Sequence, residues 1–147
     1  MSVWKEIQSS FKNGSTLTKL IYLNLAIFLF ITLISIFDTL FRLGNVSGFL
    51  VTWMAVPSTI ERLIIQPWSI ITYMFLHEGF FHILFNILWL YWFGKLFLQY
   101  LDQKKLVGLY ILGGISGALL YLFLIIFFPG SAGIHFYLVL LLLLWPL

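Results

Sequence analysis

The stretch that decides the fold is Gly79-Phe-Phe-His-Ile-Leu-Phe-Asn-Ile-Leu-Trp-Leu-Tyr-Trp-Phe-Gly-Lys-Leu-Phe-Leu98. Its only formally charged residue is Lys95, whose long side chain can reach toward a polar interface while its stem stays in an apolar region. About 20 predominantly apolar residues are needed for a helix to cross the hydrocarbon core of a bilayer. The stretch therefore predicts a transmembrane helix over about residues 79–98.

Two stretches without any charged residue flank this one, from Leu20 to Phe37 and from Leu106 to the last residue. They predict further spans at about 20–37 and 106–128, with Pro129-Gly130 ending the later one. Residues 134–147 are too few for a complete crossing at about 1.5 Å per residue. The chain is 62% hydrophobic and 9% charged, so we predict an all-α integral membrane protein with three full spans and an incomplete fourth.

The loop between the first two spans, Asp38 to Glu78, is long and apolar in places. Its segments Gly48–Val56 and Pro67–Leu76 are rich in Trp and Tyr but too short to cross a membrane. Aromatic segments of this kind favour the headgroup layer. Packing against the outer end of the helix bundle is the other interpretation, and the two are compatible. Either way, we predict a membrane-embedded first loop.

Lysines are concentrated before the first span and around the turn after the second. By the positive-inside rule, this bias predicts a cytoplasmic N-terminus, with residues 1–17 as a polar, weakly amphipathic leader. Phe37-Asp38-Thr39 does not resemble a cleavage site, so we do not expect a signal peptide. A dispersed net charge of +3 does not favour a nucleic-acid partner, and the absence of cysteine excludes disulfides. The lysines are Lys5, Lys12, Lys19, Lys95, Lys104 and Lys105, against Arg42 and Arg62 in the first loop.

The third predicted span contains Gly113-Gly-Ile-Ser-Gly117. Gly113 and Gly117 are four residues apart and share a helix face, so they predict close approach of a neighbouring helix.

Three polar residues near the start of the middle span are candidates for a functional site: His77, His82 and Asn86. At about 100° per residue, His82 and Asn86 lie about 40° apart on one helix face, whereas His77 lies about 140° from His82 and is expected at the helix entrance, facing elsewhere. Polar groups in hydrocarbon are costly unless they face the bundle interior or a wet cavity. Two donors on one face can stabilise an oxyanion, or simply bond neighbouring helices.

Metal binding by these histidines is not expected. His77 and His82 are five residues apart, and no acidic or thiol ligand shares the face of His82. A small carrier or b-type haem protein with the two histidines as ligands is a third functional class, which the differing faces disfavour.

The segment His77-Glu-Gly-Phe-Phe-His-Ile-Leu-Phe-Asn86, preceded by Pro67–Leu76, resembles the rhomboid family of intramembrane serine proteases, over roughly residues 21–128. The resemblance implies an endopeptidase that cleaves transmembrane segments of membrane proteins with a serine–histidine dyad and without metal or cofactor. It implies that His82 and Asn86 stabilise the oxyanion and that His77 is structural or lines the site. It also implies transmembrane protein substrates, the lipid bilayer as a partner and a cell-membrane location.

The family's nucleophile is a serine in a G-x-S-G-like motif at the start of span four, and its base is a histidine on span six. Ser131, in Gly130-Ser-Ala-Gly133, stands one place too early, and Ser116 fits the motif but lies mid-way along the third span. His135 follows the third span too closely to be that base. We therefore predict that this chain lacks both the nucleophile and the base. Because a serine without a base is a weak nucleophile, we also predict that the chain has no protease activity.

Two interpretations of the departure remain open. The resemblance implies that residues 18–147 are a partial rhomboid-like membrane domain. The domain belongs either to a protease truncated or frameshifted just after the third span, or to a noncatalytic rhomboid-like protein that binds transmembrane segments. An incomplete bundle leaves polar groups without partner helices, so we expect marginal folding or rescue by homo-oligomerisation.

Overall fold

The computed structural model describes residues 3–127, which form helices joined by turns and contain no strand. Three of the helices are long and apolar enough to cross a membrane. The all-α membrane fold class is thereby confirmed, while the predicted partial span at 134–147 lies outside the described residues. In chain order the elements are α1 (Val3–Asn13), α2 (Thr16–Phe41), α3 (Val46–Met54), α4 (Ile60–Ile65), α5 (Ser69–Thr72), the 3₁₀ helix η1 (Tyr73–Phe75), α6 (Phe80–Tyr100) and α7 (Gln103–Phe127).

The long helices α2 and α7 begin before the limits that charge-free stretches predicted. Ser15 caps α2 by accepting a hydrogen bond from the Thr18 N–H at 3.3 Å, and Asp102 accepts from the Lys105 N–H at 2.8 Å where α7 begins. Such caps satisfy the free N–H groups of a first turn. Hydropathy marks the part of a helix that suits hydrocarbon, whereas these polar caps set where the helix starts.

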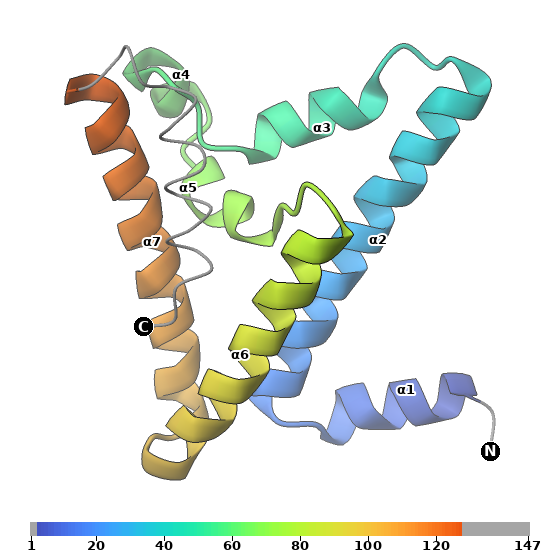
Figure 1. Ribbon diagram of the computed structural model, residues 1–147, viewed down its shortest axis with the longest axis vertical. Coiled ribbons are helices and arrows are strands. Elements are labelled where there is room, and N and C mark those ends of the chain that lie inside the picture. Colours follow the sequence, from blue (N-terminus) through green and yellow to red (C-terminus); the bar gives the residue numbers. More distant parts are fainter. Residues whose placement is uncertain (1–2, 128–147) are drawn as a thin grey trace.

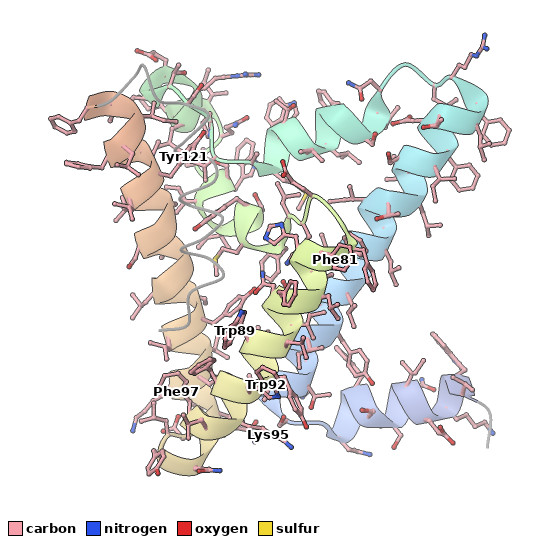
Figure 2. All side chains as sticks on the ribbon, viewed as in Figure 1. Phe81, Trp89, Trp92, Lys95, Phe97 and Tyr121 are labelled. Atoms are coloured by element: carbon pink, nitrogen blue, oxygen red, sulfur yellow. The ribbon has the colours of Figure 1, made fainter. Side chains whose placement is uncertain are left out.

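Most large side chains of the long helices point outward. Phe30 is 59% exposed, Phe81 71% and Trp92 57%, and Figure 2 shows the last two projecting from α6. Apolar surface this extensive is not stable against water, and a bilayer covers it at no desolvation cost. The chain is an integral membrane protein.

The three long helices meet at one end. Leu17 of α2 is buried against Gly94 of α6, where an added Cβ would lie 2.5 Å from the Leu17 Cδ1. Nearby, the Thr16 hydroxyl donates to Oε1 of Gln103 at 2.7 Å, which ties the start of α2 to the start of α7. From this end α2 and α7 diverge, and α3 runs between their far ends (Figure 1).

A buried polar pair joins α2 to α7 further along. Asn24 is 2% exposed; its amide donates to the Leu20 carbonyl at 2.8 Å and to the Tyr110 hydroxyl at 3.2 Å. Because a lone amide in hydrocarbon is costly, this pairing makes the burial of Asn24 tolerable and fixes the register of the two helices.

The segment α5–η1 packs into the glycine-rich part of α7. The Tyr73 hydroxyl donates to the Gly114 carbonyl, and an added Cβ on Gly114 would lie 2.2 Å from the Met74 Sδ. Close approach was predicted at Gly113 and Gly117 for a neighbouring span. The structure describes a close approach at Gly114, which a short loop helix makes; the approach at Gly113 and Gly117 stays a prediction.

The first loop satisfies the end of α3 with side chains. Backbone carbonyls in the last turn of a helix have no partner within it. Here Gln66, which is 4% exposed, donates to the carbonyls of Thr52 and Ala55 at 3.5 and 3.4 Å. The remaining two carbonyls of that turn accept from other side chains of the same segment: the Trp68 indole bonds to the Trp53 carbonyl at 3.0 Å, and the Thr72 hydroxyl bonds to the Met54 carbonyl at 2.8 Å.

The corner between α2 and α3 is built from left-handed backbone. Arg42, Gly44 and Asn45 have φ of 52°, 85° and 74°, and the Asn45 side chain accepts from the Gly48 N–H at 3.2 Å, which starts α3. The first loop thus packs on the bundle through specific contacts. Its predicted place in the headgroup layer stays a prediction.

We expect Gln66→Leu to lower the free energy of unfolding by about 1–3 kcal/mol, because it leaves two partly buried backbone carbonyls without their donor. Trp68→Phe, at a site that is 45% exposed, removes one bond that water can replace and should cost less. Denaturation of the purified chain in detergent, followed by near-ultraviolet circular dichroism, measures both. Equal stability of the Gln66 variant and the original chain would contradict this account of the loop.

Candidate functional site

The candidate site lies where the first loop enters α6. After η1 the chain is extended at Leu76, and Gly79 is extended as well, with φ −174° and ψ 175°. Helix α6 begins only at Phe80. Residues 76–79 can therefore fold back beside the first turns of α6 and do not continue its helical spiral.

This fold-back brings His77 to Asn86. The Asn86 amide lies 3.0 Å from Nε2 of His77, and Nδ1 of His77 lies 3.0 Å from the Phe75 carbonyl. A carbonyl only accepts, so Nδ1 carries the hydrogen and Nε2 accepts from the amide. The helical-wheel expectation that His77 faces away from the other two residues is wrong, because it assumed that the helix continues through residue 77.

His82 stands beside His77, with ring centroids 5.1 Å apart. The Glu78 N–H donates to Nδ1 of His82 at 3.4 Å, which leaves the hydrogen of a neutral ring on Nε2. That Nε2 is a buried atom, and within residues 3–127 it has no hydrogen-bond partner. The site therefore holds one N–H donor with no acceptor among the described residues.

His82 and Asn86 lie one turn apart on α6, which keeps them on the shared face that the sequence predicted. An amide has two hydrogens. One of them goes to His77, so the second is available beside the His82 Nε2–H.

An aromatic ring of α2 packs against the histidine pair. Phe28 meets the His77 ring edge-on, with centroids 6.4 Å apart. Burial, and secondarily the neighbouring His82, lower the pKa of His77 below its ordinary 6.5, and the hydrogen bond to the Phe75 carbonyl opposes them. His77 is thus a neutral ring at neutral pH, as its bond to Asn86 requires.

His77 is not arranged to bind a metal ion or haem iron. Both nitrogens of that ring are used in hydrogen bonds. Among residues 3–127, no group of three His, Cys, Asp or Glu side chains could hold a metal ion. The prediction that the protein uses no cofactor stays a prediction.

The described serines do not form a dyad with these histidines. Ser116 is exposed on α7 and donates to the Leu112 carbonyl, one turn back, at 2.8 Å. Within the described range no serine hydroxyl is hydrogen-bonded to a histidine. Ser131 and His135, the other candidates from the sequence, lie outside that range, so the absence of a nucleophile and base stays a prediction.

Sequence reasoning missed two supports of the site, the Phe75 carbonyl and Phe28, and it also missed the buried Asn24, which joins α2 to α7. A hydrogen bond to a backbone carbonyl leaves no trace in sequence, and Phe28 is one of many apolar residues in its span. Asn24 did carry a signal, as the single carboxamide in the charge-free stretch Leu20–Phe37.

A family model described as the Rhomboid domain matches residues 65–144, more than half of the 147-residue chain. The matched range contains α5, α6 and α7 and therefore His77, His82 and Asn86. No curated protein and no solved structure matches the chain.

We expect His77 to titrate below pH 6.5 and to carry its hydrogen on Nδ1 when neutral. A lowered folded-state pKa means that this group contributes stability above pH 6.5, and the contribution is lost as pH falls through the folded value. Protonation puts a hydrogen on Nε2, which then cannot accept from Asn86. Nitrogen-15 NMR of the histidine rings in micelles measures both the tautomer and the pKa.

His82→Gln serves as the matched variant for that titration. It removes the smaller cause of the shift, so the pKa of His77 should rise toward 6.5 without reaching it, because burial remains. A His77 that titrates at its ordinary value in the original chain would refute the enclosed geometry.

Proposed function

Because the chain belongs to the rhomboid family, we propose that its candidate site is that of an intramembrane serine endopeptidase. In this proposal His82 and Asn86 are the side chains that stabilise the oxyanion. We propose further that this chain, as written, does not cleave. The observation that carries the first part is the buried Nε2 of His82, which has no partner within residues 3–127.

An unpaired buried donor costs about 1–3 kcal/mol, so its presence calls for an explanation. In acyl transfer the carbonyl oxygen becomes an oxyanion, and preorganised N–H donors aimed at that oxygen lower the barrier. The Nε2–H of His82 and the second amide hydrogen of Asn86 are such donors, one helical turn apart. A substrate oxygen accepting from both would satisfy the atom that the protein leaves unpaired.

His77 acts as a positioning residue in this scheme. Its Nε2 accepts from Asn86 and its Nδ1–H is fixed by the Phe75 carbonyl. The relay orients the carboxamide, which would otherwise rotate about two side-chain torsions, and it keeps the nitrogen rather than the oxygen of Asn86 toward His77. This agrees with the structural or site-lining part that the family resemblance implies.

The proposed absence of cleavage rests on the predicted lack of a nucleophile and a base. Ser116 is the described serine that fits the sequence motif, but its hydroxyl is committed to the Leu112 carbonyl on an exposed face. Without a base in hydrogen-bond reach, a serine hydroxyl stays protonated and weakly nucleophilic. The same evidence favours the alternative function, in which the candidate site binds transmembrane segments without cutting them.

The proposed orientation places the N-terminus in the cytoplasm and the protein in the cell membrane, facing transmembrane substrates of other membrane proteins. The lysines near the convergent end of the bundle support this orientation through the positive-inside rule. The site then lies toward the outer side, because α6 runs from His82 toward the end at which Leu17 meets Gly94.

A transmembrane peptide whose central amide is replaced by a phosphinate mimics the tetrahedral oxyanion. We expect the full chain to bind this peptide more tightly than the parent amide peptide. His82→Phe should reduce that preference roughly tenfold to a hundredfold, the effect of losing a hydrogen bond to a charged group. Ser116→Ala is the control and should leave the preference unchanged. Equal binding of both peptides by the original chain would refute the oxyanion role.

Cleavage itself is measured by incubating the full chain with a fluorogenic transmembrane substrate in vesicles. We expect no product above the background of vesicles without protein. Any product formed by the original chain would refute the proposed inactivity. If that product disappeared in a Ser116→Ala variant, Ser116 would be identified as the nucleophile. Binding of the peptide without product fits the noncatalytic alternative.

A further inference from the structure

Helix α1 has one strongly apolar face. Val3, Trp4, Ile7 and Phe11 fall within about 100° of the helix circumference at 100° per residue. They are 72%, 69%, 43% and 50% exposed. The expectation of a weakly amphipathic leader understated this separation, because the sequence was judged as a whole and not by its helical face.

The opposite face of α1 is polar and carries the helix's two lysines. Lys5, Ser9 and Lys12 lie roughly opposite Ile7 and Phe11 on the helix circumference, and all three are exposed. A helix with an apolar face and a lysine-bearing polar face is the type that lies in a membrane interface.

A two-residue elbow sets the direction of α1. Gly14 is required there, because an added Cβ would lie 2.2 Å from the Ser10 carbonyl oxygen. The Tyr22 hydroxyl donates to the Ser10 hydroxyl oxygen at 3.2 Å, and the rings of Tyr22 and Phe11 lie 6.2 Å apart. These contacts hold α1 at an oblique angle beside the first part of α2, as Figure 1 shows.

The apolar face of α1 turns toward α2 and encloses a hollow with it. The hollow has a volume of about 600 Å³ and is lined mainly by apolar side chains. Its lining from α2 includes Leu20 and Leu23, on the helix that crosses the bilayer, with Lys19 at the same end. The apolar face of α1 is therefore continuous with the lipid-facing surface of α2.

We propose that α1 lies in the plane of the leaflet at the convergent end of the bundle, with its apolar face among the acyl chains. One phospholipid acyl chain fills the hollow between α1 and α2, and Lys5 and Lys12 pair with anionic headgroups. The bilayer is the occupant because α2 must cross it directly after the elbow, which leaves α1 at the surface. An acyl chain is the flexible apolar ligand that such an open groove admits.

The test uses the full chain, which has no native cysteine, with a single spin label at Ile7→Cys or at Ser9→Cys. Both are reconstituted into vesicles of phosphatidylcholine and phosphatidylglycerol. The label at residue 7 should be accessible to oxygen and shielded from an aqueous nickel complex, and the label at residue 9 should show the reverse. Equal access of the nickel complex to both would overturn the proposal. Shielding of residue 7 from both reagents would point to a protein partner and overturn it as well.

The headgroup contribution is tested separately with Lys5→Gln and Lys12→Gln, alone and together. In vesicles containing phosphatidylglycerol, the ratio of membrane-bound α1 to α1 detached from the membrane surface should fall about fivefold per lysine removed. This is the effect of one basic residue near an anionic surface. In phosphatidylcholine alone the substitutions should change nothing. An unchanged ratio in the anionic vesicles would refute the pairing with headgroups.

Discussion

The constraint on which this structure depends is that hydrocarbon offers no hydrogen bonds. Every buried polar group must then find its partner within the protein. The end of α3 obeys this through Gln66, Trp68 and Thr72, and the interior of the bundle obeys it through Asn24 and Tyr110. Against that background, the few buried side-chain atoms without a partner in residues 3–127 stand out. They are Asp38 Oδ1, Ser69 Oγ and His82 Nε2, and only the last belongs to the candidate site.

The site depends on contacts well removed from it. Tyr73 and Met74 fasten the loop to Gly114 of α7, and the chain leaves that contact in an extended form that returns at Gly79. His77 reaches Asn86 only because of this return. The glycine-rich part of α7 therefore acts on the site by positioning the loop, although it contributes no side chain to the chemistry.

Much of this could be predicted from sequence, and the failures have physical causes. Charge-free runs identified the three long helices, and spacing along α6 put His82 and Asn86 on one face. The position of His77 could not be obtained in that way. The extended backbone at Leu76 and Gly79 breaks the helical periodicity from which the direction of His77 relative to His82 was predicted. The partners of the Gln66 amide and of the His77 Nδ1–H are backbone carbonyls, which every residue has, so no residue type marks them. The contact on Gly114 was not predicted, because a loop helix and not a span makes it.

The lengths of the long helices have a consequence for how the protein sits in a bilayer. Helix α2 has 26 residues and α7 has 25, whereas α6 has 21, which at 1.5 Å per residue gives about 39, 38 and 32 Å. A hydrocarbon core about 30 Å thick matches α6 nearly upright, but the other two exceed it. Excess helix length of this kind is accommodated by tilt or by placing the polar end turns in the headgroup layers. Helix α6 leans in the same direction as α2, and both diverge from α7 (Figure 1), so the three helices cannot all stand upright in one bilayer, and tilt takes up part of the excess length of α2 and α7.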